Sequence, residues 1–465
     1  MSLWTSADIA AATGGTASAD FVVDGVAFDS REVGPGDLFV ALKGATTDGH
    51  KFLDQVFSRG AGGAIVSTPP ANATEAPHVL VPDTMAALEA LAHASRARMH
   101  GPVIGITGSV GKTGTKEMLF ACLDRGAPGT VHRSLKSYNN HTGVPLSVAR
   151  MPAASRYGVF EMGMNHAGEI SALTRIVRPH VAIITTVASV HIEFFKDEAG
   201  IADAKAEIFE GLAPGGTAII PYDNIHRDRL IAAALAVDAR VVTFGLGEGA
   251  DVRALETMRT TSGTFVTARL LGRELGFTIG QPGAHLVSNA LAVLAAVEAV
   301  GADVAIAGLA LADMGGLAGR GARVSVPTAD GGPNGGRALV IDESYNANPT
   351  SMRATLEVLG AEPATRRIAV LGQMGELGAD SAAFHAGLAE PVLAAGVAHA
   401  ILVGEGMQPL ANALEGRLEF VHVPDASAAR AALIALLADG DAVLVKGSNS
   451  VGLSAVVAAL SDGKG

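Results

Sequence analysis

Cysteine is nearly absent from this sequence, in which Cys122 is the only one among 465 residues. An intramolecular disulfide and a cysteine-rich metal site are therefore excluded, and a reducing, cytoplasmic setting is expected. Long apolar runs are absent too, because Gly, Pro or charged residues interrupt them, so no membrane insertion is expected. The first residues lack a basic start followed by an apolar stretch, which argues against a signal peptide.

Basic residues are outnumbered by acidic ones. The 34 Lys and Arg against 46 Asp and Glu leave a net charge of −12, which argues against a general nucleic-acid or anionic-membrane binder. An anionic small substrate is not excluded, because a few basic groups can act locally. Hydrophobic residues make up 49% of the chain and charged residues 17%, so large cores can form. The length favours about three domains.

A glycine-rich segment at 105–113 reads Gly-Ile-Thr-Gly-Ser-Val-Gly-Lys-Thr, between a strand-like run at 102–104 and a helix-like run at 116–123. Glycine lets successive backbone N–H groups turn towards an anion, and the helix behind adds the positive end of its dipole. Lys112 can reach the β- and γ-phosphates, and Thr113 can offer a hydroxyl to Mg²⁺. The segment therefore predicts a nucleoside triphosphate site. The residues expected to contact the nucleotide are Thr107, Gly108, Ser109, Val110, Gly111, Lys112 and Thr113.

The match to the phosphate-loop pattern is incomplete, because the strict pattern has glycine where this chain has Ile106. The alternative is a chance match in a chain with 57 glycines. The strand pattern before the loop and the helix pattern after it argue against chance.

Strand-like and helix-like patterns alternate along the chain, which predicts an α/β protein. Residues 1–100 are expected to form a small α/β domain and residues 101–317 a central domain, with a parallel sheet flanked by helices as in P-loop ATPases. Residues 318–465 repeat the alternation and are expected to form a Rossmann-like domain. Within these domains, 21–28 is expected to be one strand, and 251–281 a set of antiparallel strands.

Several charged residues follow predicted strands, at the sheet edge where ligands of α/β proteins bind. Glu161 ends a buried-type strand and is either a Mg²⁺ ligand or a solvated residue in a turn. His191 follows another such strand and Lys205 lies on a predicted helix, where position alone favours a structural histidine and a solvated lysine. Asp342 precedes Glu-Ser-Tyr-Asn-Ala-Asn-Pro, which fits a ligand site and a turn equally well.

Together these segments resemble the Mur ligase family, the ATP-dependent amide-bond enzymes of peptidoglycan synthesis, over nearly the whole chain. Besides the phosphate loop, the resemblance is carried by Asp29-Ser30-Arg31, 38–44, Tyr138-Asn139-Asn140, 161–170 and 342–349. The string Tyr345-Asn346-Ala347-Asn348-Pro349 is typical of the branch that adds D-alanyl-D-alanine.

The resemblance implies roles for individual residues. Those that it places at the UDP-linked substrate are Ser30, Arg31, Lys43, Gly44, Asn139, Asn140 and Thr142. Those that it adds to the ATP site are Asn289, Arg320, Asp342 and Asn346. Those that it makes Mg²⁺ ligands are Thr113, Glu161, His191 and a carbamylated Lys205, whose added carboxylate would offer an anionic oxygen. The catalytic residues that it implies are Lys112, Lys205, His191 and Arg320.

The resemblance also implies an activity: ligation of D-alanyl-D-alanine to UDP-N-acetylmuramoyl-tripeptide through an acyl phosphate, with ATP and Mg²⁺, by a monomer without a nucleic-acid partner. Three positions depart from the family pattern. Gly114 stands where many relatives have Ser or Thr, and it weakens the helix start by up to about 1 kcal/mol relative to Ala. Asn449 stands where many relatives have arginine, and 330–337 resembles a local insertion. The glycine-rich stretch 329–336 is expected to be a loop in the first hairpin of the C-terminal domain.

Three other functions compete with this reading. A folylpolyglutamate synthase would share the ligase chemistry, but the N-terminal domain and the 345–349 string argue against it. A P-loop NTPase acting as a switch would need no sugar-nucleotide domain. A dinucleotide-binding oxidoreductase would have G-x-G-x-x-G in place of the Gly-Lys-Thr turn at 111–113.

Overall fold

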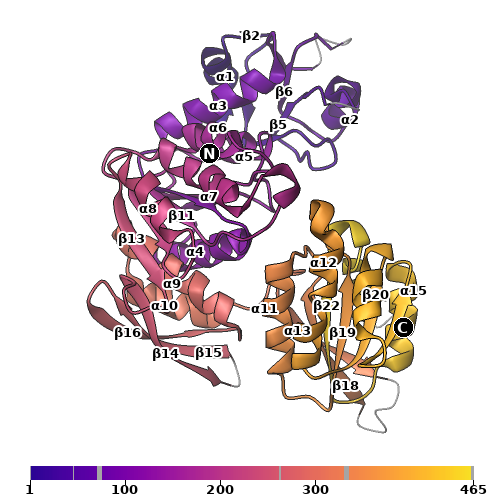
Figure 1. Ribbon diagram of the computed structural model, residues 1–465. Coiled ribbons are helices and arrows are strands. Elements are labelled where there is room, and N and C mark those ends of the chain that lie inside the picture. Colours follow the sequence, from indigo (N-terminus) through magenta and orange to yellow (C-terminus); the bar gives the residue numbers. More distant parts are fainter. Residues whose placement is uncertain (1, 45–46, 71–75, 261–262, 329–334, 462–465) are drawn as a thin grey trace.

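The protein is described here by a computed structural model that covers residues 2–44, 47–70, 76–260, 263–328 and 335–461. Within these residues the strands form sheets of two, five, nine and six strands. Figure 1 shows three domains, with the N-terminal domain at the top, the central domain below it and the C-terminal domain at one side. The predicted three-domain α/β architecture is confirmed, whereas the boundaries after residues 100 and 317 stay predictions. No helix in the described ranges is both long and apolar enough to span a bilayer.

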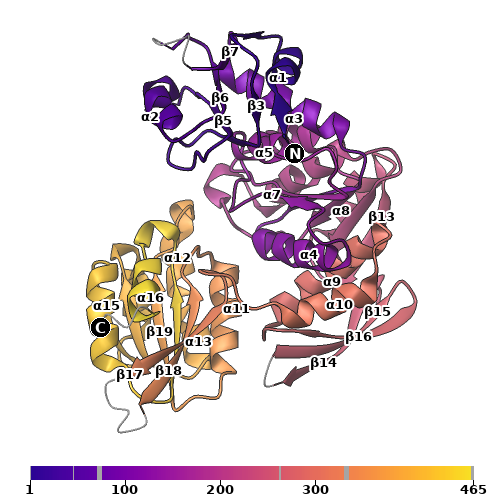
Figure 2. The ribbon, with the colours of Figure 1, turned by 180° about the vertical axis from the view of Figure 1, so that it is seen from behind.

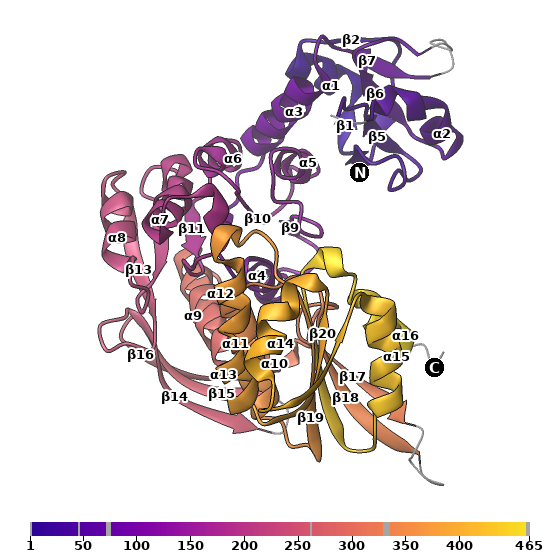
Figure 3. The same ribbon diagram turned by 45° about the vertical axis from the view of Figure 1, so that its right-hand side comes forward.

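The main N-terminal sheet is parallel except at one edge. Its strands, in spatial order, are β2 (Thr16–Ala17), β7 (His78–Leu80), β6 (Gly63–Val66), β5 (Asp37–Val40) and β4 (Gly25–Ala27), and β2 is the antiparallel one. Its helices are α1 (Ser6–Thr13), α2 (Leu53–Ser58) and α3 (Thr84–Arg98). Helix α3 extends from this domain towards the central one, as Figure 3 shows.

The prediction of a single strand over 21–28 is wrong. Val22–Val23 form β3, which pairs with β1 (Trp4–Thr5) in the two-stranded sheet, whereas β4 pairs with β5. Between them the backbone N–H of Asp24 donates to the carbonyl oxygen of Gly36 at 3.0 Å, which diverts the chain from one sheet to the other. The alternating apolar pattern therefore belongs to two strands that share one core.

The central sheet carries most of the predicted site. Its strands, in spatial order, are β16 (Arg273–Ile279), β15 (Gly263–Leu270), β14 (Val252–Thr260), β13 (Arg240–Gly245), β12 (Thr217–Pro221), β11 (Val181–Ile184), β8 (Val103–Thr107), β10 (Tyr157–Glu161) and β9 (Val131–Arg133). The strands from β9 to β14 in this order are parallel, and β14, β15 and β16 are antiparallel, which confirms the antiparallel prediction over 251–281.

Helices cover both faces of the central sheet, as predicted (Figure 2). On one face lie α4 (Lys112–Gly126), α9 (Ala284–Ala299) and α10 (Val304–Asp313). On the other lie α5 (Gly143–Ala149), α6 (Glu169–Val177), α7 (Glu198–Ala206) and α8 (Arg227–Leu235). The strands β8, β10, β11 and β12 are buried on both faces, which explains their continuous apolar runs.

The C-terminal sheet is parallel except for its first strand. Its strands, in spatial order, are β17 (Ala322–Thr328), β18 (Gly336–Glu343), β22 (Asp441–Lys446), β19 (Arg366–Gly372), β20 (Val397–Val403) and β21 (Glu419–Val423). Its helices are α11 (Pro349–Gly360), α12 (Ser381–Ala386), α13 (Ala389–Ala394), α14 (Gln408–Leu414), α15 (Ala426–Leu436) and α16 (Ser454–Ser461). Strands β17 and β18 form the predicted hairpin, while 329–334 of its predicted loop and insertion lies outside the described residues.

Candidate functional site

The phosphate loop joins β8 to α4, and its backbone geometry requires glycine at two positions. Gly108 has φ +148° and Gly111 has φ +87°, conformations that L side chains rarely adopt. A Cβ built on Gly111 would lie 2.9 Å from Asn289 Oδ1, and one on Gly108 only 1.9 Å from Thr185 Oγ1. In the described part of the chain no side chain caps the start of α4, so its first N–H groups can bind an anion.

The side chains of the loop itself face the protein. Ser109 Oγ donates to the carbonyl oxygen of Ala188 at 2.9 Å, and Thr185 Oγ1 donates to the carbonyl oxygen of Val110 at 2.5 Å. Thr107 is fully buried. The segment that follows β11 therefore fixes the loop through these hydrogen bonds. The loop presents its backbone N–H groups, and not these side chains, to a ligand.

Alanine substitutions at two nearby glycines are expected to have different effects on nucleotide binding. Gly111→Ala should weaken Mg–ADP binding about 5- to 30-fold, because a left-handed conformation costs a non-glycine residue about 1–2 kcal/mol. Gly114→Ala should leave binding unchanged and stabilise the fold by up to about 1 kcal/mol, because Gly114 lies inside α4 and no described atom comes within 4 Å of its built Cβ. Calorimetric titration and thermal unfolding measure both effects, and equal affinities in the two variants would contradict the assignment of the loop.

Lys112 begins α4 and lies at the centre of the site. Its Nζ donates to the carbonyl oxygen of Gly108 at 2.7 Å. Burial lowers its pKa; the charge of Arg320 lowers it further, and the charge of Glu161 opposes both. The charges of Glu161, in the central domain, and of Arg320, in the C-terminal domain, thus both act on the Lys112 ammonium. The structure therefore brings these three predicted residues together.

Thr113, Glu161 and Asn139 form a chain of direct contacts. Thr113 Oγ1 donates to Glu161 Oε2 at 2.8 Å, and Asn139 Nδ2 donates to Glu161 Oε1 at 2.7 Å. Glu161 is 1% exposed, at the end of β10, so it is not the solvated turn residue of the alternative reading. A hydroxyl and a buried carboxylate are hard oxygen donors, and this pair fits a Mg²⁺ ion beside the phosphate loop.

His191 and Lys205 both lie near Lys112. Burial lowers the pKa of both, and the positive charge of Lys112 lowers them further. Lys205 is 2% exposed and, throughout the described ranges, no Asp or Glu lies within ion-pairing distance of its ammonium. A solvated lysine is therefore excluded. As an ammonium, however, Lys205 does not fit a cation, and no group of three or more His, Cys, Asp or Glu side chains in the described residues could hold a metal.

The C-terminal domain reaches the site through Arg320, Asp342 and Glu376. Arg320 Nη2 donates to Ser137 Oγ of the central domain at 3.2 Å, and its guanidinium lies 4.0 Å from the centre of the Tyr345 ring. Asp342 Oδ2 accepts from the backbone N–H of Gly319 at 2.7 Å, which fixes the turn that carries Arg320. Asp342 therefore acts on the site through this turn.

Part of the 345–349 string serves the start of a helix. Asn348 Oδ1 accepts from the backbone N–H of Ser351 at 2.9 Å and caps α11, and Pro349 is the first residue of that helix. Asn346 is exposed, and its backbone carbonyl oxygen accepts from Lys446 Nζ at 2.9 Å. The string therefore starts a helix, as the turn interpretation predicts. It also exposes side chains beside that helix, as the ligand-site interpretation requires.

The residues predicted to bind the UDP-linked substrate fall into two groups. In the N-terminal domain, Arg31 exposes 83% of its side chain and is paired with Asp29, and Lys43 and Gly44 are exposed, whereas Ser30 is buried. Their exposure leaves them available to an anionic substrate. In the central domain, the other group lies just before α5.

Asn140 and Thr142 have a structural role at the start of α5. Asn140 Oδ1 accepts from Thr142 Oγ1 at 3.0 Å and from the backbone N–H of Gly143 at 2.9 Å. Only Asn139 of this loop contacts Glu161 directly. The loop is therefore fixed by its own hydrogen bonds, and its neighbour Asn139 faces the phosphate side.

Glu376 was not identified from the sequence. Its Oε2 lies 2.5 Å from His191 Nδ1, so it carries a carboxylate of the C-terminal domain into the cluster of Lys112, His191 and Lys205. Glu376 follows β19, a parallel strand, with Gly375 just before it. The strand-end rule that selected Glu161 would also have selected Glu376.

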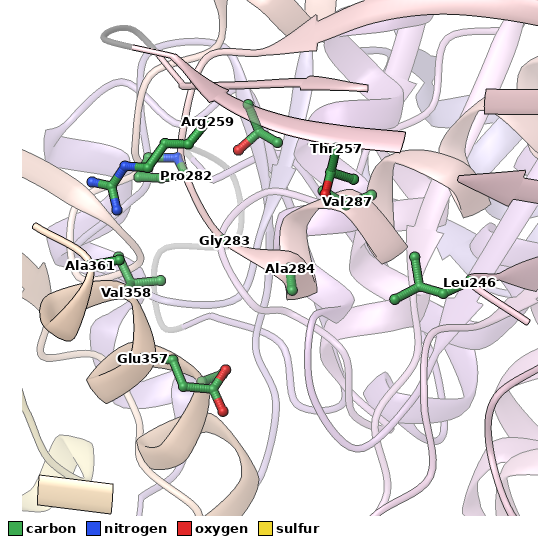
Figure 4. A pocket seen from close by; sticks show the side chains of 12 residues that line it. Leu246, Thr257, Arg259, Pro282, Gly283, Ala284, Val287, Glu357, Val358 and Ala361 are labelled. Carbon is green, nitrogen blue, oxygen red and sulfur yellow. The ribbon is translucent and has the colours of Figure 1, made fainter. Parts of the chain in front are cut away.

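A separate cavity of about 360 Å³ lies between the central and C-terminal domains (Figure 4). Thr257 and Arg259 of β14, Ala284 and Val287 of α9, and Glu357 of α11 line it. Residues of the phosphate loop do not line it, so the chemistry described above lies elsewhere.

An ion-paired carboxylate lies beside this cavity. Glu362 is 2% exposed and accepts from Arg259 Nη2 of the central domain at 2.7 Å. It also accepts from both Nη atoms of Arg323, in its own domain, at 2.9 and 2.7 Å. One buried carboxylate therefore joins the two domains on the side away from the nucleotide.

Three family models match consecutive parts of the chain. The Mur ligase family catalytic domain matches residues 22–96, the Mur ligase middle domain matches 106–297, and the Mur ligase glutamate ligase domain matches 331–449. Each of the three domains therefore contains one of these matches.

Curated relatives and solved structures match over nearly the full length. The UDP-N-acetylmuramoyl-tripeptide–D-alanyl-D-alanine ligase of Escherichia coli is 36% identical, with 96% of this chain and 95% of that protein covered. The enzyme of the same name from Rickettsia prowazekii is 30% identical, with 98% and 99% covered. MurF from Acinetobacter baumannii superposes with a TM-score of 0.85 at 31% identity, covering 99% of both chains. MurF from Thermotoga maritima in complex with ADP gives 0.77 at 26% identity, covering 95% of this chain and 98% of that one.

Proposed function

The chain belongs to the Mur ligase family, and on that premise we propose that it joins D-alanyl-D-alanine to UDP-N-acetylmuramoyl-tripeptide in peptidoglycan synthesis. The observation that carries this function is the full-length match to relatives that bear the name of this activity, at 30–36% identity. ATP supplies the driving force and leaves as ADP and phosphate, and the likeness to a structure with bound ADP supports the choice of nucleotide.

The chemistry has to overcome the low reactivity of a carboxylate, whose negative charge repels an incoming amine. A terminal carboxylate oxygen of the tripeptide attacks the γ-phosphorus of ATP, the bond to the β–γ bridging oxygen breaks, and ADP leaves. The amine nitrogen of the dipeptide then attacks the acyl-phosphate carbon. The tetrahedral intermediate collapses as the carbon–oxygen bond to phosphate breaks, and the amine proton leaves with the phosphate.

The residues of the site supply position and charge for these steps. The N–H groups at the start of α4 and the Lys112 ammonium hold the triphosphate, because they lie where the loop turns into the helix. Arg320 offsets negative charge from the C-terminal side, since its charge already reaches Lys112. Contact between the domains around the acyl phosphate excludes water that would hydrolyse it.

Mg²⁺ completes this proposal. Thr113 and Glu161 would hold one ion through their oxygen atoms, and the ion when bound neutralises charge on the phosphates. His191 and Lys205 would hold a second ion if Lys205 carries a carbamate, which replaces the positive charge by an anionic oxygen pair. Burial without an acidic partner favours that modification, because it keeps the amine neutral and nucleophilic.

We further propose that the enzyme acts as a monomer in the cytoplasm. One chain supplies the phosphate loop, the exposed N-terminal side chains and Arg320, so a complete site needs no second copy. The single buried cysteine suits a reducing compartment.

A product assay with each substrate omitted in turn tests the function. We expect ADP release and a UDP-linked pentapeptide, seen by mass spectrometry, only when ATP, UDP-linked tripeptide and D-alanyl-D-alanine are all present. Replacing the dipeptide by glutamate tests the folylpolyglutamate-type alternative and should give no product. Steady ADP release without any acceptor would instead support a nucleotide hydrolase and would overturn the ligase assignment.

A further inference from the structure

The segment 134–139 contacts four separate parts of the site within six residues. Its first half lies on α4 beside the phosphate loop, and its last residue, Asn139, donates to Glu161 Oε1 at 2.7 Å. Between these points, Ser137 Oγ accepts from Arg320 of the C-terminal domain at 3.2 Å, and Tyr138 reaches the N-terminal domain. Two charged residues outside the segment, Lys116 and Glu32, hold it in place.

Lys116 holds the first half of the segment from inside the protein. It is 0% exposed, and its Nζ donates to the carbonyl oxygens of Ser134 at 2.9 Å and Lys136 at 2.6 Å. Its third donor faces Glu117 Oε1 at 3.0 Å, so all three ammonium hydrogens have acceptors. An apolar side chain of similar length would leave the carbonyl oxygens of Ser134, which is buried, and of Lys136 without this donor, which is costly.

The backbone at this point is in a sparsely populated conformation. Lys136 has φ +51°, which is unfavourable for a residue with a Cβ and persists only where its surroundings impose it. The hydrogen bond from Lys116 to the carbonyl oxygen of this same residue supplies that constraint. The buried lysine therefore determines the direction in which the chain leaves towards Asn139.

Glu32 holds the second half of the segment from the N-terminal domain. Its carboxylate accepts from the Tyr138 hydroxyl at 2.8 and 2.9 Å and is paired with the Lys136 ammonium. Glu32 directly follows Arg31, whose exposed guanidinium is one of the groups proposed to bind the UDP-linked substrate. A ligand that moves this turn therefore pulls on the residue next to Asn139.

Both ends of the segment are hydrogen-bonded to the stretch of chain around Glu161. Ser134 Oγ accepts from the backbone N–H of Glu161 at 3.2 Å, and the carbonyl oxygen of Asn139 accepts from the N–H of Gly163 at 2.7 Å. A shift of the segment thus shifts Glu161 relative to Thr113.

We propose that Lys116 and Glu32 are positioning residues, which set the Asn139–Glu161 contact from two sides and couple the N-terminal substrate site to the ATP site through segment 134–139. This inference rests on the proposed function, because it requires that the N-terminal domain binds the UDP-linked substrate. The coupling is reciprocal: the UDP-linked substrate changes the affinity for nucleotide by the same factor as nucleotide changes the affinity for the substrate.

Three variants of the full chain test the coupling: Lys116→Met, Glu32→Gln and the control Arg98→Met. Arg98 also joins the N-terminal domain to the central one, through the carbonyl oxygen of Met151 at 3.4 Å, but it does not touch segment 134–139. Affinity for Mg–ADP is measured by calorimetry with and without saturating UDP-linked tripeptide, and kcat by ADP release. The ratio of the two affinities is the readout that loss of stability alone would not move.

We expect the wild-type ratio to differ from one, and to approach one in Lys116→Met and Glu32→Gln but not in Arg98→Met. We also expect kcat to fall roughly 100-fold in Lys116→Met and about 5- to 10-fold in Glu32→Gln. If Lys116→Met does not fold, Glu32→Gln decides alone.

Two outcomes would overturn the inference: a wild-type ratio of one, or a control that behaves like the two test variants. Failure of the proposed function is recognised separately, because the wild-type protein would then release no ADP with both substrates present.

Discussion

Replacing Lys112 by alanine is expected to lower ADP release in the presence of both substrates by about 100- to 1,000-fold, the range found when a positioned donor to developing charge is removed. Lys112 begins α4 and is half-buried, and its ammonium already donates to the carbonyl oxygen of Gly108, so it lies on the loop that would receive the triphosphate. A water molecule that fills the space left by the Lys112 side chain carries no charge, so it cannot replace the ammonium.

The exposed residue Lys196 offers a matched control in the same domain. Lys196→Ala should retain wild-type turnover, and both variants should unfold at similar temperatures, since Lys112 contributes a single hydrogen bond within the protein. A Lys112→Ala enzyme with near-normal turnover would remove the phosphate loop from the mechanism, and the ligase proposal would lose its ATP site.

Replacing Lys205 by methionine is expected to have an effect of similar size, about 100-fold or more on kcat. The side chain is 2% exposed, and its pKa is well below its usual value because of burial and the nearby Lys112 charge. A neutral amine can add to carbon dioxide, forming a nitrogen–carbon bond and releasing one proton, and the product is a carbamate. Methionine keeps the length and apolar character of the side chain but cannot react.

Carbon-13 NMR on protein exposed to labelled bicarbonate separates modification from simple burial. We expect a carbamate signal in the wild-type protein and in Lys196→Ala, but not in Lys205→Met. Turnover should also fall when carbon dioxide is removed from the buffer. A fully active Lys205→Met enzyme, or a wild-type protein without the signal, would show that this lysine is a structural residue.

The sequence predicted the parts of the site that depend on local pattern. The loop between β8 and α4 and the position of Glu161 follow from strand, turn and helix signals that lie within about ten residues of each other. The same local reasoning gave the wrong answer at 21–28, because the hydrogen bond that diverts the chain there comes from Gly36, which lies on a separate turn.

The remaining parts of the site depend on contacts between distant segments. Periodicity could not distinguish Lys205 from a solvated lysine, since only the packed structure shows its burial and its nearness to Lys112. Likewise, Lys116 resembles an ordinary helical lysine until Ser134 and Lys136 are seen to place their carbonyl oxygens over it. The family resemblance found the first of these lysines, and only the structure found the second.

The carboxylate of Glu362 has a consequence for how the two larger domains separate. Arg259 would leave with the central domain, but Arg323 stays bonded to both oxygens from within the C-terminal domain. Rotation about this edge therefore gives up the Arg259 pair but leaves both oxygens of Glu362 with a donor. The two domains can therefore part and rejoin at this edge without leaving an unpaired buried charge.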